Sequence, residues 1–226
     1  MLTTLHLFTL RPRRVPLALL RAAIDPRRLR GAPGVRFAKV LGTGDGATFA
    51  LRDADPRRWG VLCVWEDGQP TGGPVLDGWR RIAGEEWRAD LALIHSRGRW
   101  ARREPFGEPA AALDHRGPVA AITRARLRPS RAGAFRRAVP PVARDAAQQP
   151  GLRFSMGIGE APIGLQGTFS VWASAADLTA FAYRGAAHRE VVRRTPEAGW
   201  YAEELFARFA LIRTAGTIGG RDPAQD

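Results

Sequence analysis

The feature that most constrains the fold of this 226-residue chain is an internal repeat. Short motifs of the first half recur in the same order about 117 residues further on. The clearest pairs are Leu10-Arg11-Pro12 with Leu127-Arg128-Pro129, Pro33-Gly34-Val35-Arg36-Phe37 with Pro150-Gly151-Leu152-Arg153-Phe154, and Ala89-Asp90-Leu91-Ala92-Leu93-Ile94 with Ala207-Arg208-Phe209-Ala210-Leu211-Ile212. Self-similarity at a fixed offset indicates a duplicated structural unit. We therefore expect two copies of one fold, in residues 1–96 and 118–220, joined by a linker over 97–117.

Both copies predict the element order strand, helix, strand, strand, helix, strand. The first copy predicts strands over 3–10, 35–41, 59–65 and 91–95, with helices over 16–24 and 75–83. The second predicts strands over 119–127, 152–157, 168–172 and 205–212, with helices over 131–147 and from 175. Pro140-Pro141 should kink or break the first of these helices. The order βαββαβ is that of a ferredoxin-like unit, so we expect an α+β protein whose two sheets pack together and enclose a pocket.

The net charge of +13 at first suggests a nucleic-acid partner. However, Lys39 is the only lysine, and Ala, Gly, Pro and Arg are all abundant, as a GC-rich genome would produce. The arginines occur singly or in pairs, without the interleaved aromatic residues of a nucleic-acid site. The charge therefore favours a solvated basic surface, leaving open a contact with an anionic membrane surface.

The single cysteine, Cys63, rules out an intrachain disulfide and favours a reducing compartment. It alternates within a predicted strand, which is typical of a small core residue. No window approaches 18 consecutive apolar residues. The first charges follow the N-terminal apolar run rather than precede it, unlike a secretory signal. We expect a cytoplasmic protein.

The second copy carries a stretch over 181–195 that the first copy lacks, and function should lie where the copies differ. If this stretch is helical, Phe181, Arg184, His188 and Val192 fall on one face. Gly185 could instead divide it into two short helices. A neutral imidazole presented to an apolar cleft is how proteins hold haem iron. The alternative is a buried His188 bonded to a backbone carbonyl.

The other titratable residues give weaker signals. No two histidines have metal-ligand spacing, which disfavours a zinc site; the remaining three are His6, His95 and His115. Glu160 and Glu203 are single candidates that are more typical of surface or capping positions. The larger apolar residues of the second copy could be core, pocket lining or both.

Several runs of the second half are distinctive: Gly151-Leu152-Arg153-Phe154-Ser155-Met156-Gly157-Ile158-Gly159-Glu160-Ala161-Pro162, Thr168-Phe169-Ser170-Val171-Trp172, Phe181-Ala182-Tyr183, His188 and Gly199-Trp200-Tyr201-Ala202-Glu203-Glu204-Leu205-Phe206-Ala207-Arg208-Phe209. These runs resemble the spheroidene monooxygenase family, the carotenoid ketolases of purple bacteria. Segments 97–100, 117–125 and 128–131 fit as well. The resemblance covers most of the chain and is weakest in the first half, which leaves the exact substrate open.

The resemblance implies a monooxygenase that inserts an oxygen atom from O₂ into an acyclic carotenoid or a similar apolar molecule. It also implies haem as cofactor, a ferredoxin-type electron donor and a dimeric α+β barrel-type architecture. Peripheral contact with a membrane is compatible with such a substrate. No nucleic-acid partner is expected.

The resemblance also implies roles for individual residues. His188 would be the axial ligand of the haem iron, and Arg184 would hold a haem propionate or lie near bound oxygen. Both would be catalytic. The haem pocket would further include Met156, Trp172, Phe181 and Tyr183, and the substrate pocket would include Gln166 and Trp200.

Three other functions remain open at this point. A cofactor-free monooxygenase or isomerase of the same barrel type would use His188 as a general base. A non-catalytic carrier would bind haem or an apolar ligand without turnover. An RNA-binding module ranks last, because it needs aromatic residues exposed on an open sheet, whereas here they should be buried between two sheets.

Overall fold

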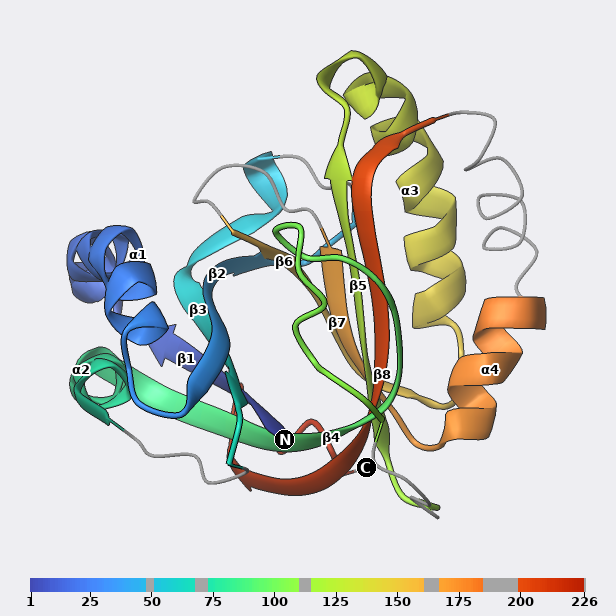
Figure 1. The fold of residues 1–226 in the computed structure, drawn as a ribbon. Helices are drawn as coiled ribbons and strands as arrows, with labels where there is room; N and C mark the ends of the chain where they lie inside the picture. Colours follow the sequence, from blue (N-terminus) through green and yellow to red (C-terminus); the bar gives the residue numbers. More distant parts are fainter. Residues whose placement is uncertain (48–50, 68–72, 110–114, 161–166, 185–198, 226) are drawn as a thin grey trace.

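Figure 1 shows one antiparallel barrel with helices on its outside. The computed structural model describes residues 1–47, 51–67, 73–109, 115–160, 167–184 and 199–225. Within these residues the strands are β1 (Leu2–Leu10), β2 (Val35–Gly44), β3 (Ala54–Trp65), β4 (Ala83–Gly98), β5 (Val119–Leu127), β6 (Leu152–Gly159), β7 (Gly167–Trp172) and β8 (Tyr201–Gly216). The helices are α1 (Val15–Arg30), α2 (Gly73–Ile82), α3 (Ala132–Ala147) and α4 (Ala175–Arg184), with 3₁₀ turns at Pro12–Arg14, Leu51–Asp53 and Pro129–Arg131.

Each half forms a ferredoxin-like sheet, as the repeat predicts. The strand order is β2-β3-β1-β4 in the first half and β6-β7-β5-β8 in the second, and pairing of β4 with β8 and of β2 with β6 closes the barrel. The helices α1 and α2 cover the first sheet, while α3 and α4 lie beside the second (Figure 1). The two halves therefore close one barrel within a single chain, which confirms the predicted fold class.

Two glycines at equivalent positions illustrate the duplication. Gly98 and Gly216 end β4 and β8, and both have positive φ, at 93° and 79°. A Cβ atom at Gly98 would lie 2.2 Å from the carbonyl oxygen of Glu204, and one at Gly216 would lie 2.0 Å from that of Glu86. Only glycine fits such an approach of two backbones.

The barrel interior is filled by side chains from both halves. Leu7 and Trp87 of the first half and Phe169 and Phe209 of the second belong to one buried cluster. The segment expected to be a linker contributes Trp100, which is fully buried. The described residues thus occupy the space in which we expected a pocket between the two sheets.

Several elements are longer than the sequence predicts. The strands β4 and β8 each have 16 residues, because each pairs with its own half and with the other along the seam between the halves. The helix α1 continues through Pro26 to Arg30. The helix α3 runs through Pro140 and Pro141, so the prediction of a break there was wrong. Proline has a helical φ, so a helix can continue through it, at the cost of one backbone hydrogen bond and of crowding between its ring and the carbonyl four residues earlier.

Candidate functional site

The outer face of the first sheet is closed by its helices. Phe8, Trp59 and Cys63 of the sheet pack against Trp79 of α2 in one buried cluster. Burial raises the pKa of the Cys63 thiol to about 12, so this cysteine is a neutral core residue, as the sequence predicts. This side of the molecule is an ordinary packed core.

The corresponding outer face of the second sheet carries much smaller side chains. At the repeat offset of 117 residues, Ala125 replaces Phe8 and Gly157 replaces Val40. The pairing of β7 with β5 and β6, compared with that of β3 with β1 and β2, matches Thr168 to Val61 and Ser170 to Cys63, at a shorter offset of 107 residues. Thr123 and Ser155, whose equivalents His6 and Ala38 are buried, are exposed in mid-strand. We call this surface the second outer face and define it by Ala121, Thr123, Ala125, Ser155, Gly157, Thr168 and Ser170.

The helices beside the second outer face bury few side chains. Of the described side chains of α3, only Val139 is buried, and it packs with Phe135. Near α4 the buried cluster is limited to Leu178 and three sheet residues. In the described part of the chain, this face thus carries small side chains where the first half has a filled core. Thr123 and Ser155 are exposed there, whereas Ala121, Ala125 and Gly157 are buried.

Aromatic residues lie at both ends of the second outer face. The ring of Trp172 stacks on Phe181 of α4 with centroids 5.2 Å apart, and its indole N–H donates to Ser170 Oγ at 2.9 Å. Trp200 contacts the ring of Phe135 on α3 at 5.8 Å. Trp172 is level with the start of β5, and Trp200 lies beyond its end. These contacts frame the surface.

The structure brings some of the predicted site residues together and separates another. Trp172 and Phe181 lie against each other on the outer side of the second sheet, and Trp200 lies at its far end. Met156 belongs instead to the barrel interior, on the opposite side of β6. Tyr183 and Arg184 are the last residues of α4, and their side chains are outside the described part of the chain. His188 and Gln166 lie outside the described residues.

Two of the other histidines have structural partners. His6 is buried and its Nδ1 lies 2.9 Å from Glu86 Oε1; burial lowers its pKa despite this carboxylate. His115 Nε2 lies 2.7 Å from the Pro118 carbonyl oxygen. Within the described residues no group of three metal-ligating side chains occurs. The same residues contain no helix that is long and apolar enough to cross a bilayer.

A charged network at one end of the barrel was missed by the sequence analysis. The Arg124 guanidinium, whose side chain is 6% exposed, donates to Glu160 Oε1 at 2.6 Å and to Glu203. Lys39 also donates to Glu160, and so does the Trp100 indole N–H, at 2.7 Å. Burial raises the pKa of Glu160, but the hydrogen bond from Lys39 and the nearby cations outweigh it and hold that pKa below its usual value.

Glu203 fixes the turn that follows Trp100. Its carboxylate accepts the backbone N–H groups of Ala101 at 3.1 Å and Arg102 at 2.7 Å. Both residues have positive φ, at 54° and 62°, which is uncommon outside glycine. The one signal in the sequence was Arg124 itself. It follows Ala120 and Ile122 at alternate positions of one strand, so its side chain also points inward. A buried guanidinium needs an anionic partner, because an unpaired buried charge is costly.

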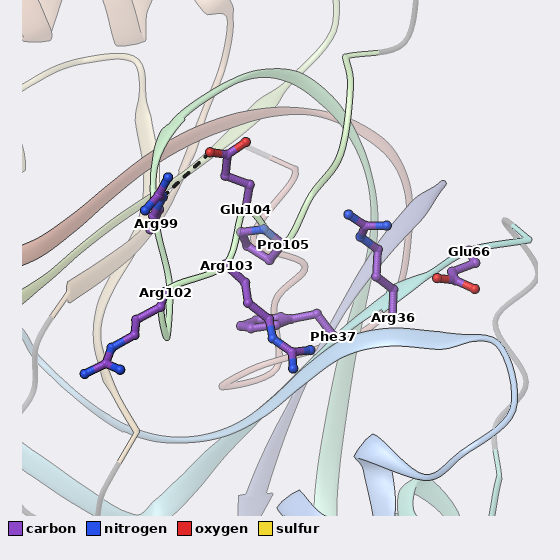
Figure 2. A pocket seen from close by; sticks show the side chains of 8 residues that line it. All are labelled: Arg36, Phe37, Glu66, Arg99, Arg102, Arg103, Glu104 and Pro105. Atoms are coloured by element: carbon purple, nitrogen blue, oxygen red, sulfur yellow. Dashed lines mark ion pairs between the residues drawn. The ribbon is translucent and has the colours of Figure 1, made fainter.

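A groove of about 600 Å³ opens beside this turn (Figure 2). Its lining residues are Arg36, Phe37, Glu66, Arg99, Arg102, Arg103, Glu104 and Pro105. Figure 2 shows the arginine side chains of the turn and of β2 arranged around the groove, with Arg99 paired to Glu104 at 3.8 Å. Four arginines against two glutamates make this an anion-attracting surface.

A barrel closed by two fused ferredoxin-like units, with its helices outside, defines a dimeric α+β barrel protein in single-chain form. Two solved structures share this fold. An aldoxime dehydratase (OxdRE) in complex with butyraldoxime has a TM-score of 0.56 at 10% identity, covering 99% of this chain and 83% of that one. A second aldoxime dehydratase has a TM-score of 0.53 at 10% identity, covering 93% and 80%.

Sequence relatives identify the family. The spheroidene monooxygenase of Rhodobacter capsulatus is 34% identical over 215 residues, which cover 92% of this chain and 89% of the relative. Those of Rubrivivax gelatinosus and Cereibacter sphaeroides are 36% and 32% identical over 84% of this chain, covering 74% and 60% of the relatives. No family model matches the chain. The chain belongs to the spheroidene monooxygenase family and is an enzyme of the monooxygenase class, as the resemblance implied.

Proposed function

We propose that this protein is a haem-dependent monooxygenase that inserts one oxygen atom from O₂ into an acyclic carotenoid or a similar apolar molecule. The family supports the reaction class. The observation that carries the proposal is the second outer face, where a duplicated fold has lost the large side chains that fill its other half.

The second outer face suits a flat, apolar prosthetic group. Its floor is formed by alanine, glycine, serine and threonine, so a planar ring can lie close to the strands. Trp172 and Phe181 at one end and Trp200 with Phe135 at the other offer apolar edges. The same group could not enter the first half, where Phe8, Trp59 and Trp79 occupy the equivalent space.

The residues that would hold the haem follow from α4, which lies beside this face (Figure 1). In the proposal His188, four residues after the end of α4, would provide the imidazole that holds the haem iron, and Arg184 would pair with a haem propionate or lie near O₂. Tyr183 completes the haem pocket with Trp172 and Phe181. Gln166 and Trp200 contact the substrate. Met156 supports β6 from the interior rather than touching the cofactor.

Haem iron would supply the activation of O₂. The chain would position the haem and the substrate and provide the apolar surroundings of both. The aromatic residues at the two ends of the face would bind a polyene by apolar contact. Arg184 would compensate the negative charge of the haem propionate with which it pairs. Insertion of one oxygen atom leaves the other to be reduced to water, which consumes two electrons and two protons.

A ferredoxin-type protein is the proposed source of these electrons. Such a donor is acidic, and the arginine groove of Figure 2 offers it a complementary surface. Charge reversal at Arg102 and Arg103 should lower the donor's apparent affinity and weaken its salt dependence, while turnover with a small chemical reductant stays unchanged. Equal loss with both reductants would contradict this docking site.

The decisive experiment is an absorption spectrum of protein purified from haem-supplemented cells, with His188→Ala and the matched control His115→Ala. We expect a Soret band in the wild type and in the His115 variant, and its loss or shift in the His188 variant. A folded wild type that stays colourless after haem titration would overturn the haem proposal. Turnover by colourless protein would identify a cofactor-free enzyme with His188 as base, and haem loading without turnover would identify a carrier.

A further inference from the structure

One helix carries most of the exposed large apolar side chains in the described part of the chain. Among the described residues six such side chains are exposed, and four of them lie on α1. These are Leu17, Leu19, Leu20 and Ile24, which are 37–55% exposed. Leu17, Leu20 and Ile24 are spaced by three and four residues, so they form one stripe along the helix.

The opposite side of α1 faces the first sheet and is less apolar than the exposed side. Ala18, Asp25 and Leu29 are buried there. Asp25 is held by Arg21 at 3.1 Å and by Arg28 at 3.4 Å. A helix that only covered a sheet would place its leucines inward and its charges outward. On α1 this arrangement is partly reversed, because several large apolar side chains are exposed and a carboxylate is buried.

The helix α3 provides an internal control, because it occupies the equivalent place in the second copy at the same offset of 117 residues. There the position of Leu20 is taken by Arg137, which is exposed, and the inward positions of Ala18 and Ala22 are taken by Phe135 and Val139. The fold therefore accepts a polar outer surface at this helix. The exposed leucines of α1 are a property of the first copy alone.

Arginines lie at both ends of the apolar stripe. Residues 11–30 contain seven arginines and one aspartate, a net charge of +6. Arg13 and Arg14 precede the stripe and Arg27 and Arg30 follow it, all of them exposed. The aspartate, Asp25, is buried and already paired. An apolar stripe bordered by solvated arginines, with no exposed acidic residue on the helix, is the pattern of a helix that lies in a membrane interface.

We propose that α1 is an interfacial docking helix, which inserts Leu17, Leu19, Leu20 and Ile24 among the headgroups of an anionic membrane while its arginines pair with lipid phosphates. A second copy of the chain is a poorer occupant, because two such surfaces face to face would oppose like charges. The inference is independent of the haem proposal, since it needs neither cofactor nor turnover.

Vesicle flotation tests the proposal with the full chain. Vesicles of phosphatidylcholine with added phosphatidylglycerol should bind the wild type, and vesicles of phosphatidylcholine alone should bind it less. The double variant Leu20→Ser, Ile24→Ser and the double variant Arg13→Gln, Arg14→Gln should each lose roughly tenfold in binding. Arg137→Gln on α3 is the matched control and should bind as the wild type does. Circular dichroism establishes that each variant is folded.

A site-specific probe keeps the test independent of partial misfolding. Leu20→Cys labelled with a polarity-sensitive fluorophore should shift to the blue on adding anionic vesicles, whereas Arg137→Cys should not. Cys63 is buried and should not react. Absence of vesicle binding, equal binding by the serine variant, or a concentration-dependent dimer that the serine variant abolishes would each overturn the proposal, the last in favour of self-association.

Discussion

At the scale of single residues, Trp100 joins the apolar core of the barrel to its charged end. Its ring lies fully buried within the interior cluster, contacts Phe37 at 5.6 Å and lies 5.6 Å from the Arg124 guanidinium. Its indole N–H donates to Glu160 at 2.7 Å. One side chain thus fills a large apolar space in the core and also donates a hydrogen bond to Glu160. Without it, this carboxylate would accept hydrogen bonds only from Arg124 and Lys39 among these side chains.

Removing this side chain should destabilise the whole molecule. We expect Trp100→Ala to lower the free energy of unfolding by about 3–5 kcal/mol, as for other buried large-to-small substitutions. Trp100→Phe keeps most of the apolar contact and loses the indole donor, so its cost should be smaller, about 1–3 kcal/mol. Urea unfolding followed by circular dichroism measures both values. A stability of Trp100→Ala equal to that of the wild type would show that the segment after β4 is not an integral part of the core.

At the scale of elements, the duplication allows each helix and strand to be compared with its copy. The outward positions of β1, β2 and β3 carry side chains that fill a core, and those of β5, β6 and β7 carry small ones. The helix α1 exposes leucines where α3 exposes arginine. The two copies have thus kept one fold while the side chains on their outer surfaces diverged.

This comparison predicts the effect of filling the second outer face. Thr123 and Ser155 are exposed, so the double variant Thr123→Phe, Ser155→Phe should change the free energy of unfolding by only about 0.5 kcal/mol. If haem lies on this face, the variant should lose at least roughly tenfold in haem affinity, equivalent to about 1.4 kcal/mol. Absorption titration with haem measures this affinity.

The matched control is Ala215→Phe, an exposed position of β8 where that strand pairs with β4 instead of β5. It should take up haem as the wild type does. Wild-type affinity in the filled variant would place the cofactor elsewhere on the protein.

At the scale of the whole molecule, the two halves share one core. Residues of both belong to the same interior cluster, and the seam between β4 and β8 runs from Trp87 paired with Gly216 to Gly98 paired with Leu205. The seam between β2 and β6 has only three pairs. The barrel should therefore behave as one cooperative unit although its sequence is a tandem repeat.

We expect unfolding in urea to be a single transition. Tryptophan fluorescence and far-ultraviolet circular dichroism should give the same midpoint, because neither sheet can keep its inner face buried alone. A fragment of residues 1–98 should fail to fold, since its sheet would expose Leu7, Leu62 and Trp87 to water. Two resolved transitions, or a stable folded fragment, would contradict a shared core.

Prediction from the sequence succeeded where the signal is local and repeated. The strand at 119–127 was predicted with the residues it has in the structure, and the helix at 131–147 was off by one residue. The lengths of β4 and β8 were underestimated, because their added residues are stabilised by pairing across the barrel rather than by their own apolar pattern. Glu160 and Glu203 looked unrelated because they meet Arg124 only when three separate segments converge.

The sequence by itself determined the duplication, the ferredoxin-like units, the core position of Cys63 and the family. Each of these conclusions depends on the order of motifs or on the alternation of apolar and polar residues, and both can be read from neighbouring positions of the chain. Only the tertiary structure decided that the segment after β4 fills the barrel, that Met156 and Trp172 lie on opposite sides of one sheet, and that the leucines of α1 face solvent. Each of these features depends on which surfaces of the chain contact one another. Close packing determines those contacts, and it does so only when the two sheets have closed into the barrel.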